Sequence, residues 1–218
     1  MTQSEDLQER LAHVRWLGGS PCSGKSSIAE MVAERHGLCV YHVDKAFDRH
    51  RACFTPERHP TLTKWTRTPW NELWMQPADV LLSEAIADYT EHFEFILKDL
   101  LEFPAHRLVL AEGTALLPRC VAPLLSQPRQ ALWMVPTEQF QRTVYPERGE
   151  WVQGILATCD DPDAALKNWM DRDVAFAQWV LAETERLDLS SIVVDGTHTI
   201  ETNAERVADF FGFANPTP

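Results

Sequence analysis

The chain has 218 residues, of which 44% are hydrophobic and 24% charged, a composition typical of one globular domain with room for an insertion. Its net charge of −12 argues against nucleic acid and anionic membrane surfaces as partners, because like charges repel. Five scattered cysteines without a C-x-x-C pair, no apolar leader and no long apolar run predict a cytoplasmic protein with reduced thiols.

The first informative pattern is a glycine-rich motif, because Gly19 to Ser26 reads G-x-x-x-x-G-K-S, the spacing of a phosphate-binding P-loop. The two glycines allow a turn whose N–H groups point at a phosphate. Lys25 would reach the β- and γ-phosphates, and Ser26 would bind Mg²⁺. A strand predicted over 13–17 and a helix predicted over 25–36 supply the context that the motif requires. The residues expected to bind a nucleotide are Gly19, Ser20, Pro21, Cys22, Ser23, Gly24, Lys25, Ser26 and Ser27.

A second strand, predicted over 38–43, ends at Asp44. Ligands of α/β proteins lie beyond the carboxyl ends of the strands, so Asp44 should face the same crevice as the P-loop. A carboxylate there could accept the proton of an attacking hydroxyl. Asp48 is the second candidate for that role, and pairing of Asp44 with Lys45 or helix capping is the structural alternative.

The segment 45–77 has no regular periodicity and mixes aromatic with basic residues. It is either a substrate-side insertion for a ring-bearing or anionic small molecule, or a cap that packs on the sheet. A long helix is predicted over 78–103, because apolar residues recur there at steps of three and four.

The next strand, predicted over 107–111, ends in Glu112. A carboxylate that follows an apolar strand is typical of the position that holds Mg²⁺ in P-loop proteins, although a purely structural role is the alternative. A short helix over 116–125 and a strand over 131–135 follow, and Thr137 is predicted to cap the next helix.

The region 138–172 is a candidate lid, with Arg142, Arg148 and Arg172 as possible sources of positive charge for a transferring phosphate. A surface role is the alternative for each arginine. Asp161-Pro162 predicts a helix start, and that helix should run to about 186. A strand over 191–194 and a helix over 200–211 complete the chain.

Strand and helix therefore alternate about five times over 1–218, which predicts a single α/β domain with a parallel sheet and helices on both faces. The sequence contains neither the N-K-x-D motif expected of a GTPase nor the G-x-S-x-G motif expected of a hydrolase. Zinc binding by Cys39 and His42 is disfavoured, because a strand would point them to opposite faces.

The stretch from Gly18 to Ser27, followed by Val43-Asp44, resembles the small P-loop kinases. These include the gluconate, shikimate and nucleoside-monophosphate kinases and, most similar, the chloramphenicol phosphotransferase-like group. The resemblance covers about 13–212. It implies a three-layer α/β/α P-loop NTPase fold with a five-stranded parallel sheet of order 2-3-1-4-5 and a helical lid. It also implies ATP and Mg²⁺ as cofactors and a small-molecule acceptor.

By the same resemblance, Asp44 falls on the position of the base, Arg142 would stack on adenine and Arg148 would close on phosphate. Two departures stand out. The aromatic segment 45–77 matches no acceptor site of the family, and 150–172 is longer than a minimal lid, so Arg172 is expected to share or replace the role of Arg148.

The leading hypothesis is an ATP-dependent kinase acting on a small-molecule hydroxyl, with Lys25, Asp44, Arg148 and Arg172 as catalytic residues and Ser26 and Glu112 as metal ligands. The alternative is a nucleotide-binding switch or regulatory ATPase without a dedicated acceptor. A polynucleotide 5′-hydroxyl kinase is the third hypothesis, and the acidic charge counts against it. The sequence leaves the acceptor and the oligomeric state open.

Overall fold

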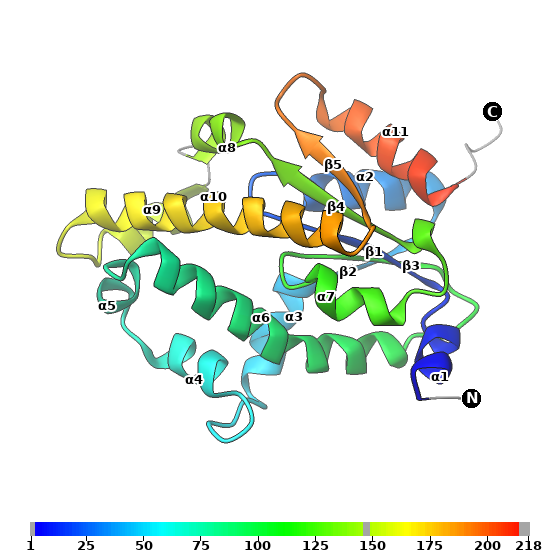
Figure 1. The fold of residues 1–218 in the computed structure, drawn as a ribbon, viewed down its shortest axis with the longest axis horizontal. Helices are drawn as coiled ribbons and strands as arrows, with labels where there is room; N and C mark the ends of the chain where they lie inside the picture. Colours follow the sequence, from blue (N-terminus) through cyan, green and yellow to red (C-terminus); the bar gives the residue numbers. More distant parts are fainter. Residues whose placement is uncertain (1–2, 146–148, 214–218) are drawn as a thin grey trace.

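The computed structural model describes residues 3–145 and 149–213, and its centre is one five-stranded sheet (Figure 1). All neighbouring strands pair in parallel, in the order β2-β3-β1-β4-β5. The predicted α/β class, parallel sheet and strand order 2-3-1-4-5 are therefore confirmed. The strands are β1 (Val14–Gly19), β2 (Cys39–His42), β3 (Val109–Glu112), β4 (Ala131–Pro136) and β5 (Ser190–Val194).

Helices cover both faces of the sheet, which explains why every residue of β3 and β4 is buried. On one face, α2 (Lys25–His36) and α11 (Ile200–Phe211) pack on a core that includes Leu17 of β1. On the other, α6 (Ala78–Leu101) and α10 (Pro162–Arg186) pack on a core that includes Trp16. Successive residues of a strand point to opposite faces, so β1 feeds both cores and fixes the three layers.

The ends of the helices follow the predicted capping signals. The Thr137 side chain accepts a hydrogen bond from the Phe140 amide, and Asp161 does the same for Ala164, which confirms both caps. The predicted helix over 116–125 is shorter than expected. The remaining short elements of the sheet layers are α1 (Gln3–Arg10), α7 (Pro118–Val121) and the 3₁₀ turns η1 (Ala122–Leu124) and η2 (Pro128–Gln130).

The segment 45–77 is more regular than its sequence suggested. It contains most of α3 (Val43–Arg51) together with α4 (Pro60–Arg67) and α5 (Trp70–Trp74). Strand β2 ends at His42, so Asp44 lies in the first turn of α3 and not at the end of a strand. Short helices of this kind have too few turns to show a clear apolar period, and packing against neighbours stabilises them.

The candidate lid also forms helices, α8 (Glu138–Val144) and α9 (Gly149–Leu156). A third apolar core joins α5, α9 and the start of α10, away from the sheet. Trp74 of α5 stacks on Trp169 of α10 there, with ring centroids 3.9 Å apart and planes inclined by 8°. The two segments that interrupt the alternation of strands and helices therefore pack on each other and form a cap beside the sheet (Figure 1).

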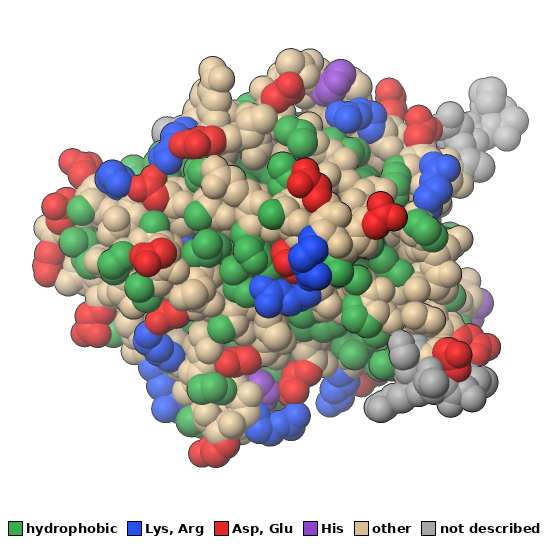
Figure 2. Space-filling view, in the orientation of Figure 1, with side chains coloured by type: hydrophobic (Ala, Val, Ile, Leu, Met, Phe, Trp, Pro, Cys, Tyr) green, Lys and Arg blue, Asp and Glu red, His purple; other side chains and the backbone are tan. Residues whose placement is uncertain are grey.

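Acidic and basic side chains are spread over the face of the molecule that Figure 2 shows, with apolar side chains between them. Within the described ranges, no helix offers an apolar stretch long enough to cross a bilayer.

Candidate active site

The loop between β1 and α2 has a backbone that requires glycine at two positions. Gly19 has a φ of 130°, and a Cβ atom there would lie 2.0 Å from the carbonyl oxygen of Met134. Gly24, which precedes α2, has a φ of 79°. Cys22 also has a positive φ, 67°, which is uncommon for a residue with a side chain. The glycines of the motif therefore serve a tight turn at the carboxyl edge of the sheet.

Lys25 folds back into this loop instead of extending into solvent. Its Nζ donates to the Ser20 carbonyl at 2.8 Å and lies 3.3 Å from Ser23 Oγ, which in turn donates to the same carbonyl at 2.9 Å. The Lys25 side chain is buried. The loop thus surrounds an ammonium group, and the first N–H groups of α2 add positive potential beside it, an arrangement suited to an anion.

A cavity of about 220 Å³ opens over the loop. Residues from two neighbouring segments close it: Asp44 in the first turn of α3, and Glu112 at the end of β3 with Thr114 just beyond it. The residues that line it are Pro21, Cys22, Ser23, Gly24, Lys25, Ser26, Ser27, Asp44, Glu112 and Thr114. The structure therefore brings the predicted loop residues 21–27 together with both predicted carboxylates.

Glu112 is the best-anchored carboxylate of this cavity. Ser26 Oγ donates to Glu112 Oε2 at 3.1 Å, and His42 Nδ1 lies 2.7 Å from Glu112 Oε1. The sheet register explains the second contact, because His42 and Glu112 are direct neighbours on β2 and β3. A serine hydroxyl and a carboxylate in contact are oxygen ligands of the kind that Mg²⁺ takes, so the residues present fit that ion.

Two residues of this site were missed by the sequence analysis. The only sequence signal for His42 is that it is a polar residue at the end of an apolar strand. Gln141 of α8 donates from Nε2 to the Pro21 carbonyl at 3.1 Å and so fastens the loop to the candidate lid. No motif marks Gln141, since the contact depends on how α8 packs.

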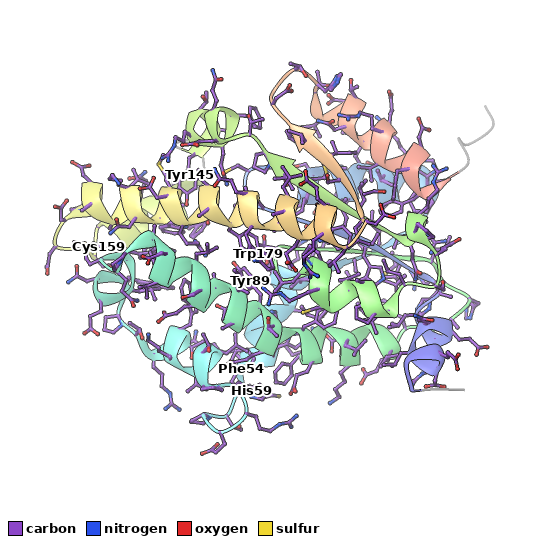
Figure 3. The ribbon with its side chains drawn as sticks, in the orientation of Figure 1. Phe54, His59, Tyr89, Tyr145, Cys159 and Trp179 are labelled. Atoms are coloured by element: carbon purple, nitrogen blue, oxygen red, sulfur yellow. The ribbon has the colours of Figure 1, made fainter. Side chains whose placement is uncertain are left out.

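A second, larger cavity of about 340 Å³ adjoins the first. The two share Pro21, Asp44 and Thr114 in their linings. Aromatic side chains are the largest group in the second wall, and they come from the inserted segments, α6 and α10. Its aromatic residues are Phe47, Trp65, Trp70, Trp74, Tyr89, Trp151 and Trp169. Figure 3 labels Tyr89, which lies between α6 and α10. The segment 45–77 therefore both packs as a cap and lines a cavity.

Besides Asp44 and Thr114, the polar groups of this aromatic cavity lie on α6 and α10. Arg172 is buried, with its Nε 2.9 Å from Asp173 Oδ1 and its guanidinium 5.2 Å from the centre of the Trp74 ring. Burial alone would lower the pKa of Arg172, but Asp173 and other neighbours raise it, so the group stays charged. Burial also raises the pKa of Asp88 well above its usual value, although Arg172 opposes that effect.

The predicted arginines do not gather on one phosphate in the part of the chain that the structure describes. Arg142 pairs with Glu138 at 2.9 Å and Asp171 at 2.8 Å and lines neither cavity. Arg172 lines the aromatic cavity and not the loop cavity. Arg148 lies outside the described residues. Asp48, the second candidate for the base, lines neither cavity.

Comparisons with known proteins add no function. No family model and no curated protein matches the chain. A solved structure of an uncharacterized protein from Eubacterium ventriosum ATCC 27560 is similar at 15% identity, with a TM-score of 0.44, over 91% of this chain and 97% of that one. A likeness at this level carries no argument about chemistry.

Proposed function

We propose that the protein is an ATP-dependent phosphotransferase that transfers a phosphoryl group to a hydroxyl of a small molecule. One observation carries the proposal: the cavity over the glycine-rich loop and the aromatic cavity meet at Asp44. A phosphate held in the first and a hydroxyl presented from the second would come together beside a carboxylate. Phosphoryl transfer depends mainly on this kind of positioning, together with charge stabilisation.

The loop cavity supports the donor side. The N–H groups of residues 19–25 and the Lys25 ammonium would hold the β- and γ-phosphates of ATP. The contact between Lys25 Nζ and the Ser20 carbonyl means that the ammonium already lies inside the loop. Only a modest movement of this side chain would turn it from Ser20 toward an incoming phosphate. We assign neutralisation of the transferring charge to Lys25, and keep Arg148 as a predicted second cation.

Ser26 and Glu112 would hold the magnesium ion, with Glu112 oriented by His42. When bound, this ion neutralises phosphate charge during transfer. His42 Nε2 also lies 3.6 Å from Glu30 Oε1. The imidazole therefore sits between two carboxylates and limits the rotation of Glu112, as outer partners of metal ligands generally do.

Asp44 is the residue that we assign to the acceptor hydroxyl. Its carboxylate accepts the hydroxyl proton, the acceptor oxygen forms a bond to the γ-phosphorus, and the bond from that phosphorus to the β–γ bridging oxygen breaks to release ADP. Arg172 faces the acceptor side, where it lines the aromatic cavity. In this scheme Arg172 binds the acceptor and does not contact the phosphoryl group before transfer.

The test compares Asp44→Asn with Asp48→Asn, because both residues lie on α3 but only Asp44 lines the cavities. The chain is incubated with ATP, Mg²⁺ and a panel of ring-bearing alcohols, and phosphorylated product is followed by ³¹P NMR. We expect Asp44→Asn to lower turnover by about 10²- to 10⁴-fold while ATP affinity persists, with Asp48→Asn close to wild type. Tight ATP binding without product across the panel would instead support the regulatory alternative.

A further inference from the structure

A row of hydrogen-bonded side chains runs from Asp99, near the surface of α6, to His92 in the wall of the aromatic cavity. Asp99 Oδ2 lies 2.8 Å from His50 Nε2, and His50 Nδ1 lies 2.8 Å from His92 Nε2. His50 and His92 are 4% and 2% exposed, whereas Asp99 is open enough to accept further hydrogen bonds from Tyr41 and Arg49. The roles assigned to the proposed kinase do not use these residues.

Aromatic rings hold the two imidazoles in place. Phe47 meets His92 edge-on with ring centroids 5.2 Å apart, and Phe95 stacks on His50 at 5.6 Å. Phe54 also contacts His92 from outside the cavity, and Figure 3 shows Phe54 with His59 beside α6. Ring flips of either histidine would break a buried hydrogen bond, so the order of the atoms along the row is fixed.

That order, together with the number of protons on His50, determines which ring nitrogens carry protons. Partial burial alone would raise the pKa of Asp99, but hydrogen bonds from Tyr41, His50 and Arg49 lower it, so the carboxylate only accepts. His50 must then carry a proton on Nε2. When His50 carries only that proton, its Nδ1 accepts, so His92 donates from Nε2 and keeps its lone pair on Nδ1. A second proton on His50 would reverse this order.

His92 itself stays neutral, because burial is the main cause that lowers its pKa to about 3. It lines the aromatic cavity, and only its Nε2 is engaged by His50. The other residues of the wall are aromatic or aliphatic, except for Asp44, Asp88, Thr114, Arg172 and Asp173. A hydrogen-bond acceptor of fixed polarity in such a wall is a recognition group, since an apolar ligand surface there would leave it unpaired.

We propose that His50 carries a single proton, so that the Asp99–His50–His92 row makes His92 a hydrogen-bond acceptor for the bound acceptor molecule. That molecule is a flat-ring compound with an O–H or N–H donor besides the hydroxyl that is phosphorylated. The assignment of a phosphorylated hydroxyl depends on the proposed function, but the contact with His92 does not. The aromatic walls select the ring. Asp99 and His50 are positioning residues.

The first test measures the tautomers directly. Ring ¹⁵N NMR of the histidine-labelled full chain at pH 7.5, without nucleotide, should show both His50 and His92 protonated on Nε2, with assignments from His50→Gln and His92→Gln. Protonation of His92 on Nδ1, which a charged His50 would produce, overturns the proposal. If a variant does not fold, the ring nitrogen signals of the wild-type chain can be assigned through their coupling to the side-chain carbons. The wild-type spectrum alone then distinguishes the two outcomes.

The second test uses two probes, 4-methylphenol and its O-methyl ether 4-methylanisole, which lacks the O–H donor, with tryptophan fluorescence as the readout. We expect the wild-type chain to bind the phenol about fivefold more tightly, as one net hydrogen bond allows. His92→Phe should abolish that preference while both probes still bind, and His59→Gln, at a histidine outside the cavity lining, should retain it. Equal affinities in wild type, or a preference that survives in His92→Phe, would overturn the assignment.

These measurements need neither ATP nor turnover. Failure of phosphoryl transfer with an intact preference for the phenol would reject the proposed function and leave the His92 contact standing. The reverse result would reject only the contact.

Discussion

At the scale of single residues, the site depends on how a few polar groups are held. Glu112 is fixed at both oxygens, by Ser26 and by His42, so its orientation is set before any ligand arrives. Lys25 is already inside the loop that it would serve. Preorganisation of this kind is what electrostatic stabilisation of a transferring phosphoryl group requires. The pair of Ser26 and Glu112 gives the most direct residue-level prediction.

Glu112→Gln should raise the Mg²⁺ concentration needed for half-maximal activity by about 10- to 100-fold, because the variant removes the charge that faces the cation while keeping the shape. The measurement is a Mg²⁺ titration of ADP formation. Glu30→Gln is the matched control, since Glu30 also lies close to His42 but is absent from the cavity lining. An unchanged Mg²⁺ requirement in Glu112→Gln would remove Glu112 from the metal site.

The depressed pKa of His92 predicts how stability depends on pH. The unfolded chain protonates this histidine near pH 6.5, whereas the folded chain resists protonation down to about 3. The unfolded state therefore binds more protons in that window, so the unfolding free energy falls as the pH drops below about 6.5. The loss is on the order of 1 kcal/mol per pH unit at most. Urea denaturation at pH 7 and pH 5 should show a smaller drop for His92→Gln than for wild type.

At the scale of elements, the sequence predicted well wherever local signals decide the structure. The alternation of strands and helices, α2 after the glycine-rich motif, and the caps at Thr137 and Asp161 follow from periodicity and turn chemistry. The strand order was expected only from the resemblance to the small P-loop kinases. The cap beside the sheet could not be predicted from these local signals. Its helices are short, and its core forms between residues far apart in the chain, such as Trp74 and Trp169, which no local pattern relates.

The candidate site shows the same division. The loop and Glu112 could be predicted because motif and strand ends place them, and Asp44 was expected at the right edge but in the wrong element. Arg172 was expected at a phosphate, but it lines the aromatic cavity. His42, Gln141 and His92 carry no motif, because their roles come from contacts between elements.

The stacked tryptophans give a prediction for the cap. Trp74→Ala should lower the unfolding free energy by about 3–5 kcal/mol, because Trp74 is 1% exposed and packs face to face on Trp169. Trp70→Ala, at a residue of the same helix that is 38% exposed, should cost less than about 1 kcal/mol. Guanidinium denaturation of both variants tests this. Equal losses would show that the third core does not hold the cap.

At the scale of the whole molecule, the sheet and the inserted segments build different cavities. The carboxyl edge of the sheet carries the loop cavity, and the cap built from 45–77 and the start of α10 carries most of the aromatic cavity. In the proposed phosphotransferase, the loop would hold the phosphate donor and the cap would select the acceptor. Asp44 lies at the junction because α3 leaves the sheet there and enters the cap.

The most direct test of the proposed phosphotransferase site is a crystal structure of the full chain with Mg²⁺ and a non-hydrolysable ATP analogue. We expect the phosphates to lie in the loop cavity against Lys25, the metal to contact Ser26 and Glu112, and the terminal phosphate to face Asp44 at the mouth of the aromatic cavity. A nucleotide bound elsewhere, or a terminal phosphate directed away from Asp44, would contradict the proposal.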